Sequence, residues 1–254
     1  MSVSGVAAQA LQRIEHVMGM AIVLDVRDTH VEETAADRVF DWLGFVDETF
    51  STYKPESEIC RLDRGELTVA DAHPDVVAVL ESCEELRQET RGYFDARAGG
   101  RLDPSGLVKG WAVDRAAEIL EQAGARNFAV YAGGDIIVRG RPLPEERWHV
   151  GIRHPQHADQ VAAIVEAGHL AVATSGAYAR GDHVLDPHTR RPPTGLLSVT
   201  ITGPLLATAD AYATAAFAMG SRGPAWTARL DGYEALSITD DERVLTTPGF
   251  PAAG

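Results

Sequence analysis

The sequence predicts an α+β fold in which antiparallel hairpins are interrupted by separated helices. The chain has 254 residues, of which 45% are hydrophobic and 24% charged, so it can bury a sizeable core. Helical spacing of apolar residues is confined to a few segments, and short strand patterns with turn residues fill much of the rest. Hairpin runs broken by helices favour α+β over a doubly wound parallel sheet. We expect one compact unit over residues 1–254, with one lobe or two.

The first half of the chain predicts one buried strand and three helices. The run MAIVLDV is continuously apolar, as in a buried strand, and the residues after it repeat their apolar positions three or four apart, as in a helix. The second helix is expected to bury Val76, Val77, Leu80, Cys83 and Leu86. In order, we predict a strand over 20–26, a helix over 31–50, a polar, irregular connection over 51–64, a helix from Pro74 to about Gly92, and a helix over 107–123 that Gly124 ends.

The second half predicts mainly short strands and one helix. Gly133-Gly134-Asp135 between two apolar runs is a strong hairpin signal. A helix over 209–219 is expected to begin at Thr208 as its N-cap and to end before Gly220. The predicted strands are 128–132, 136–138, 148–153, 161–166, 170–173 and 197–202, with a closing hairpin of 234–239 and 243–246.

The composition excludes several classes of function. Lys and Arg total 23 against 37 Asp and Glu, which gives a net charge of −14. Such a surface repels phosphate backbones and anionic lipid, so we expect neither a nucleic-acid nor a membrane partner. Cys60 and Cys83 are the only cysteines, which argues against a disulfide scaffold or a zinc ribbon. Because no signal peptide, lipoprotein signal or membrane-spanning run is visible, we expect a cytoplasmic protein.

Asp210 and Thr214 form the strongest chemical signal in the sequence. They are four residues apart in the first turns of a predicted helix, so their oxygens point the same way. A carboxylate and a hydroxyl on one helical turn suit Mg²⁺, which prefers oxygen ligands. The alternative is that Asp210 only meets the helix dipole and Thr214 only packs.

A second signal is the segment 102–110, LDPSGLVKG, which leads into the third helix. Asp103 and Ser105 have the side chains of helix caps, which is a purely structural explanation. The functional explanation is that Pro104 and Gly106 bend the backbone toward a ligand, while Lys109 supplies a point charge for phosphate. The residues alone leave both explanations open.

The third signal is Thr174-Ser175-Gly176 at the end of a strand, followed by a loop that contains His183, Asp186 and His188. Small hydroxyl residues with Gly suit the approach of a phosphate. Ser175, His183 and Asp186 also have the residue types of a nucleophilic triad, but no G-x-S-x-G motif accompanies them. His183 and His188 are a further, weaker candidate pair for a transition metal.

Several stretches taken together resemble the ApbE family, the FAD:protein FMN transferases. The resemblance covers about residues 18–220, in the family's order. The matching stretches are 18–19 (MG), 50–53 (FSTY) with 57–59 (SEI), 92–95 (GYFD), 102–103 (LD) with 109–114 (KGWAVD), 133–136 (GGDI), 148–152 (WHVGI), 173–176 (ATSG), 183–187 (HVLDP) and 209–215 (ADAYATA).

The resemblance implies a T-fold-like α+β enzyme that binds FAD and cleaves its diphosphate with Mg²⁺. FMN would move to a Thr or Ser hydroxyl of a target flavoprotein, and AMP would be released. The metal ligands implied are Asp210, Thr214 and the carbonyl of Gly106, and the catalytic residues are His183, a candidate general base, and Lys109. The FAD contacts implied or expected are Met18, Tyr53, Tyr93, Phe94, Asp95, Asp103, Lys109, Thr174, Ser175, Gly176 and Val184.

The sequence departs from the family pattern after Asp186-Pro187, where Arg190 stands in place of a usual Gly. Two other functions use the same residues. With water as the acceptor the protein would be an FAD diphosphatase, and without turnover it would be an FAD-binding module. A chain with a net charge of −14 that holds a diphosphate has an electrostatic need for Mg²⁺, which is consistent with both enzymatic functions.

Overall fold

The structure is a computed structural model that describes residues 10–144, 146–157, 159–176 and 184–253. None of the helices in these ranges has the length and apolar character needed to cross a membrane. The elements in chain order are β1 (Leu11–Val17), β2 (Met20–Val26), α1 (Glu33–Phe50), α2 (Glu58–Asp63), η1 (Val69–Asp71), α3 (Pro74–Glu89), α4 (Ser105–Gln122), β3 (Phe128–Ala132), β4 (Asp135–Arg139), β5 (Trp148–Arg153), β6 (Val161–Ala167), β7 (His169–Gly176), β8 (Leu196–Gly203), α6 (Leu206–Ala218), η2 (Gly220–Arg222), α7 (Gly223–Thr227), β9 (Glu234–Thr239) and β10 (Val244–Thr246).

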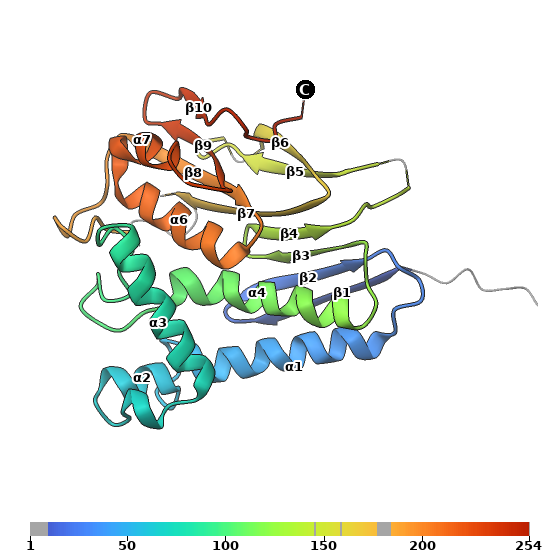
Figure 1. The fold of residues 1–254 in the computed structure, drawn as a ribbon, viewed down its shortest axis with the longest axis horizontal. Helices are drawn as coiled ribbons and strands as arrows, with labels where there is room; N and C mark the ends of the chain where they lie inside the picture. The colour runs from blue at the N-terminus through green and yellow to red at the C-terminus, as the bar shows by residue number, and fades with distance from the viewer. Residues whose placement is uncertain (1–9, 145, 158, 177–183, 254) are drawn as a thin grey trace, which may run out of the picture.

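Eight strands form one sheet in the order β1-β2-β3-β4-β7-β8-β9-β10, and β5 pairs with β6 in a separate hairpin. Every neighbouring pair is antiparallel. Helices α1, α4 and α6 lie side by side across one face of the large sheet (Figure 1). The predicted α+β class is therefore confirmed.

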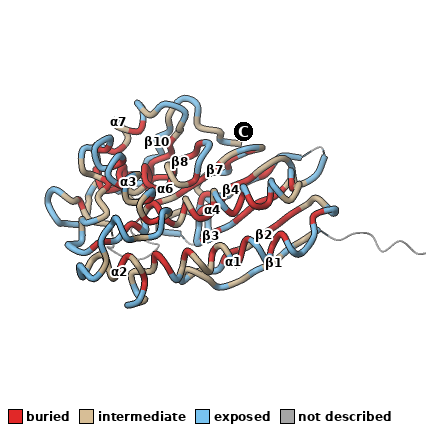
Figure 2. The backbone as a smooth tube through the Cα atoms, turned by 60° about the horizontal axis from the view of Figure 1, so that its bottom comes forward, coloured by how far each residue is buried: buried red, intermediate tan, exposed pale blue. Residues whose placement is uncertain are grey.

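The sheet separates two apolar cores, one on each face. Along β4, Ile137 belongs to the core beneath the helices, whereas Ile136 and Val138 belong to a smaller core that also contains Trp148 and Val165 of the β5–β6 hairpin. This alternation follows from the two-residue period of a strand. Figure 2 shows buried positions running through the strands and through α4 and α6, with exposed positions on the connecting loops. We refer to the two sides as the helix face and the hairpin face.

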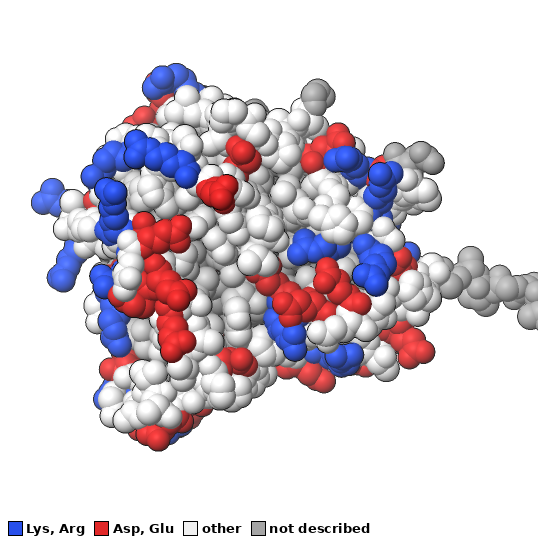
Figure 3. Space-filling model, viewed as in Figure 1, with Lys and Arg blue, Asp and Glu red and all other residues white. Residues whose placement is uncertain are grey.

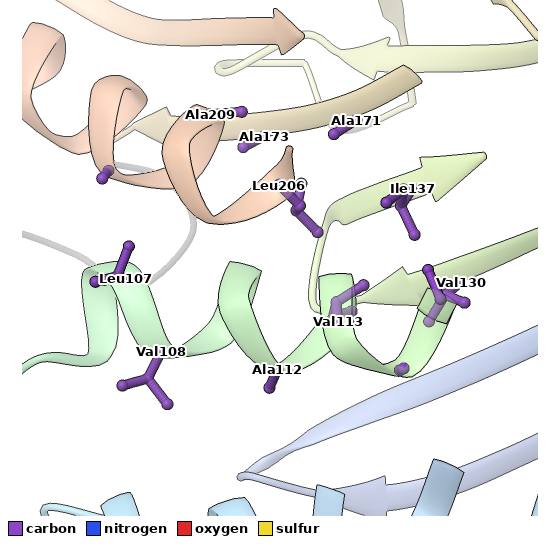
Figure 4. Packing of buried hydrophobic residues seen from close by; sticks show 14 of the residues in the cluster. Leu107, Val108, Ala112, Val113, Val130, Ile137, Ala171, Ala173, Leu206 and Ala209 are labelled. Carbon is purple, nitrogen blue, oxygen red and sulfur yellow. The ribbon is translucent and has the colours of Figure 1, made fainter. Parts of the chain in front are cut away.

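Helices α4 and α6 pack closely beneath the helix face. Helix α6 is rich in alanine, and Ala209, Ala213 and Ala216 are fully buried. Figure 4 shows Leu107 and Val113 of α4 and Leu206 of α6 pointing into the space between the two helices. Small residues bring the two helix backbones close together, and this packing positions the polar residues described below.

The structure corrects four expectations. Residues 11–17 form β1, which was not predicted, so Met18 and Gly19 lie in a hairpin turn rather than before the first strand. The connection over 51–64 is not wholly irregular, because α2 forms there with Ser57 as its N-cap, whose Oγ accepts the Cys60 N–H at 3.1 Å. In α3, Val79 is buried where Val77 and Leu80 were expected. Helix α6 begins at Leu206 instead of 209.

Acidic side chains gather over α3 on the face shown in Figure 3, while arginines lie nearer its upper left edge. Helix α3 carries Glu81, Glu84, Glu85 and Glu89 among its sixteen residues. On this face, part of the negative charge expected from the composition thus lies over α3. An anionic ligand approaching this face needs local cations to offset that repulsion.

Candidate functional site

Lys109 lies at the centre of the candidate site and joins three elements. Its Nζ lies 2.6 Å from Oδ2 of Asp135, the first residue of β4, and 3.4 Å from Oδ1 of Asp210 in α6. Asp135 is 2% exposed and Asp210 4%, whereas the Lys109 side chain retains 20% exposure. Burial in a medium of low dielectric strengthens such pairs, so the ammonium fixes both carboxylates. Residues from three separate parts of the sequence therefore meet at one point.

The N-terminal turn of α4 also approaches α6 at Gly106 and Thr214. A Cβ built on Gly106 would lie 3.2 Å from Cε2 of Phe94 and 3.7 Å from Oγ1 of Thr214. Phe94 would crowd a side chain at this position, so glycine lets the α4 backbone lie close to Phe94 and Thr214. These contacts and the Lys109–Asp210 pair show that the two distant segments lie against each other. Their role as one binding site stays a prediction.

The residues expected to approach phosphate, Thr174-Ser175-Gly176, lie at the end of a strand, as predicted: they are the last residues of β7. Asp135 Oδ1 accepts the Thr174 N–H at 3.0 Å, which ties β7 to β4. Ser175 Oγ lies 3.4 Å from Thr214 Oγ1 on the helix face, while Thr174 Oγ1 lies 2.9 Å from Thr200 Oγ1 across the strands. Ser175 thus adds a hydroxyl to the site. The contacts of Thr174 and Gly176 with a cofactor stay predictions.

The first N–H groups of helix α6 are capped by the side chain of Asp114, a residue of α4 that the sequence did not suggest. Leu205 is its N-cap and makes no side-chain cap, so the expected cap at Thr208 is wrong and Asp210 lies in the second turn. The carboxylate of Asp114 in α4 accepts the N–H groups of Leu206 and Ala207, both at 2.8 Å. Burial raises the pKa of Asp114, and these two hydrogen bonds oppose that rise.

The predicted aromatic contacts differ widely in their surroundings. Phe94 is buried against Gly106, and the Tyr93 ring has its centroid 4.6 Å from that of His188. Arg222 places its guanidinium 5.1 Å from the Tyr93 ring centre. Tyr53 is 94% exposed in the loop after α1. Only Phe94 therefore touches the residues of the site described above.

Several other predicted residues have local structural roles. Asp95 Oδ1 accepts the Arg97 N–H, and Asp103 Oδ1 accepts the Ser105 N–H at the start of α4. The N-cap of α4 is Pro104, without a side-chain cap, so neither Asp103 nor Ser105 is the N-cap that the structural explanation expected. Met18 takes a φ of +56° in the β1–β2 turn, and Val184 packs against the main core. Their roles toward FAD stay predictions.

His183 lies outside the described residues, so its role as a base stays a prediction, as does the triad that includes it. Nε2 of His188 lies 3.1 Å from the Arg91 carbonyl oxygen, and Asp186 Oδ1 accepts the His188 N–H. Arg190 takes a φ of +56°, the backbone conformation that favours glycine. The departure at this position therefore changes the side chain without changing that conformation.

The oxygen atoms at this site fit a hard cation. Asp210 and Thr214 supply a carboxylate and a hydroxyl one turn apart on α6, and Gly106 lets the α4 backbone lie close to Thr214. Within the described residues no group of three or more His, Cys, Asp or Glu forms a metal site. The expected ligands contain only one such residue. A cavity of about 560 Å³ elsewhere is lined by Trp42, Trp111 and other residues, but not by Lys109, Asp135 or Asp210.

Sequence reasoning missed Asp135 and Asp114. Asp135 belongs to the hairpin signal and to the family resemblance, and nothing in its neighbourhood in the sequence indicates its ion pair with Lys109. Asp114 caps a helix that begins 92 residues later in the sequence. No local sequence pattern predicts a capping partner at that separation.

The sequence matches the family model of the ApbE family over residues 18–100 and 96–237. It is 33% identical over 193 residues to the FAD:protein FMN transferase of Vibrio cholerae serotype O1, covering 67% of this chain and 58% of that protein. It is 34% identical over 174 residues to the protein of the same name from Treponema pallidum, covering 61% of this chain and 48% of that protein. The chain thus spans about half the length of these curated relatives.

The fold has close counterparts among solved structures. The flavin transferase ApbE from Vibrio cholerae superposes with a TM-score of 0.85 at 23% identity, covering 96% of this chain and 98% of that one. The strand order and helix layer described above are therefore a known architecture. Because the family match also runs from residue 18 to residue 237, this chain belongs to the ApbE family.

Proposed function

We propose that this protein transfers FMN from FAD to a Thr or Ser hydroxyl of a target flavoprotein, with Mg²⁺, and releases AMP. The observation that carries the proposal is the meeting of α4 and α6 at two points. Lys109 approaches Asp210 at 3.4 Å, and the α4 backbone at Gly106 lies close to Thr214. Family membership and the names of the relatives support the same reaction.

The charges of the site explain why a divalent ion is needed. Asp135 and Asp210 carry two negative charges and Lys109 one positive charge, so the cluster has a net charge of −1 when all three are ionised. A diphosphate is repelled by that charge and by the net charge of the whole chain. A divalent cation at Asp210, Thr214 and the Gly106 carbonyl changes the local sum to +1, which attracts phosphate.

The reaction needs one bond formed and one broken. The acceptor oxygen bonds to the phosphorus of the FMN half, and the bond from that phosphorus to the bridging oxygen breaks, so AMP leaves with the electron pair. Bound Mg²⁺ supplies neutralisation of the charge on the phosphoryl oxygens. Lys109, held by Asp135 and Asp210 and with a side chain that is 20% exposed, would supply a positive charge to the same phosphates. His183 is the candidate acceptor of the hydroxyl proton.

The test combines the purified protein with FAD, Mg²⁺ and a lysate of the source organism as the pool of acceptor proteins. The expected result is a fluorescent flavin-bearing band on a denaturing gel, together with release of AMP, and both should disappear with EDTA. Free FMN and AMP without any labelled band would instead identify a diphosphatase. FAD binding with no AMP under any of these conditions would identify a binding module and overturn the proposal.

A further inference from the structure

Helix α4 meets α6 along one stripe made of Gly106, Gly110 and Asp114. These residues are four apart, so they lie on the same side of the helix. A Cβ built on Gly110 would lie 2.5 Å from the carbonyl oxygen of Leu206 and 2.7 Å from the Cα of Ala207. No side chain fits at such distances. The two helix backbones are therefore in direct contact at Gly110.

Asp114 completes this contact one turn further along α4. Its two oxygens accept the N–H groups of Leu206 and Ala207, the first two residues of α6. These N–H groups have no partner inside their own helix, and Leu205 provides no side-chain cap. The start of α6 is thus capped by a carboxylate from another helix rather than by the side chain of its own N-cap residue.

The same two helices carry the residues of the proposed cation and phosphate site. Asp210 and Thr214 follow the capped end of α6 by one and two turns, and Gly106 and Lys109 precede Asp114 on α4. A helix is rigid over such short lengths, so the position of its first turn sets the position of the next two. A shift of the α6 start against α4 moves Asp210 and Thr214 relative to Gly106 and Lys109.

We propose that Asp114 is a positioning residue of the site: it fixes the register of α6 against α4 and so sets the affinity for the divalent cation. Gly110 assists by allowing the contact between the backbones. This inference rests on the cation site of the proposed function and adds a residue that touches neither the metal nor FAD. A cap that served only stability would have no effect on cation affinity.

The test measures binding of Mn²⁺ alone, as a spectroscopic substitute for Mg²⁺, by electron paramagnetic resonance. In Asp114→Asn one oxygen is replaced by an NH₂ group that cannot accept a hydrogen bond, while the shape of the side chain is kept. We expect the Kd for Mn²⁺ to rise at least about tenfold, because small displacements of ligands weaken metal sites strongly.

Asp28→Asn is the matched control. Asp28 also accepts two consecutive backbone N–H groups from a distant segment, those of Arg126 and Asn127, both at 2.6 Å. It lies in the connection between β2 and α1, which contains none of the site residues. We expect this variant to lose thermal stability, since Asp28 and Asp114 make the same kind of hydrogen bond to backbone N–H groups. The Kd for Mn²⁺ should stay within about twofold of the wild type, because Arg126 and Asn127 belong to neither α4 nor α6.

A second variant separates positioning from stability. In Asp114→Asn combined with Leu205→Asp, the N-cap residue of α6 can accept N–H groups of its own first turn. We expect the thermal midpoint to recover while the Kd for Mn²⁺ stays high, because the new cap does not reach α4. Recovery of both, or an unchanged Kd in Asp114→Asn, would overturn the inference. A wild type that binds no Mn²⁺ would remove the proposed cation site, a separate failure that also removes this inference.

Discussion

The sheet carries an ion pair on each of its faces, and the two are built differently. On the helix face, Lys109 contacts Asp135 at 2.6 Å and Asp210 at 3.4 Å, with Ser175 and Thr214 nearby. On the hairpin face, Arg27 contacts Asp25 at 2.7 Å, and its guanidinium lies 5.6 Å from the centre of the Trp148 ring. The first group combines one cation with two carboxylates, and the second balances one cation with one carboxylate.

This difference separates a site from a structural pair. A pair of one cation and one carboxylate has no net charge, so it has no surplus of negative charge for an added cation to neutralise. An unbalanced cluster with hydroxyl groups beside it keeps a surplus of negative charge, which an added cation neutralises. We therefore expect substitutions in the Lys109 cluster, but not in the Arg27 pair, to lower activity and to make stability depend on Mg²⁺.

The largest effect is expected at the carboxylate that has no counterpart on the hairpin face. Asp210→Ala removes the only carboxylate among the expected metal ligands, so we expect AMP release from FAD to fall by roughly 10³-fold. The measurement is the rate of AMP formation at saturating FAD and Mg²⁺, with far-ultraviolet circular dichroism to show that the fold is kept. Activity within twofold of the wild type would contradict the assignment of Asp210 to the metal.

The next effect tests the cation of the cluster. Lys109→Met leaves two buried carboxylates without the ammonium between them, and breaking a buried pair of this kind costs about 3 kcal/mol of unfolding free energy. We expect a lower urea midpoint, together with a roughly 10²-fold loss of AMP release. Saturating Mg²⁺ should restore part of the lost stability, because it supplies positive charge at Asp210. A urea midpoint that does not respond to Mg²⁺ would contradict the surplus of negative charge.

The smallest effect is expected on the hairpin face. Arg27→Met breaks the balanced pair, but Arg27 is partly exposed, so we expect a cost of only about 1 kcal/mol in unfolding free energy. AMP release should be unchanged, and Mg²⁺ should not shift the urea midpoint beyond its effect on the wild type. A fall in AMP release comparable to that of Lys109→Met would show that the two faces are coupled.

Elements with strong local patterns were predictable from the sequence, and those that depend on distant partners were not. The Gly-Gly hairpin and the long helices α1 and α4 carry their signals within their own residues. Strand β1 was not predicted because its apolar and polar residues do not match its buried and exposed positions. Ile14 is exposed, whereas Arg13 faces the helices and pairs with Asp37 of α1. Helix α2, with six residues, is too short to show a period.

The candidate site divides in the same way. Gly106, Lys109, Asp210 and Thr214 lie in two segments whose spacing and residue types suggested chemistry, and the structure brings them together. The role of Asp135 was not predictable because Gly-Gly-Asp predicts a turn whether or not the carboxylate then forms an ion pair. The start of α6 was misplaced because a Thr near a helix end normally caps it, and the true cap comes from Asp114 in another helix.

The two-residue loop of the β3–β4 hairpin also decides on which side of the sheet a charge appears. Gly133 and Gly134 both have positive φ, and Asp135 follows directly, in register with Ala132. Because side chains along a strand alternate between faces, one residue inserted between Asp135 and Ile136, with the rest of β4 in place, would turn this carboxylate to the hairpin face and away from Lys109. The number of residues between the turn and Ile136 thus determines whether Lys109 meets one carboxylate or two.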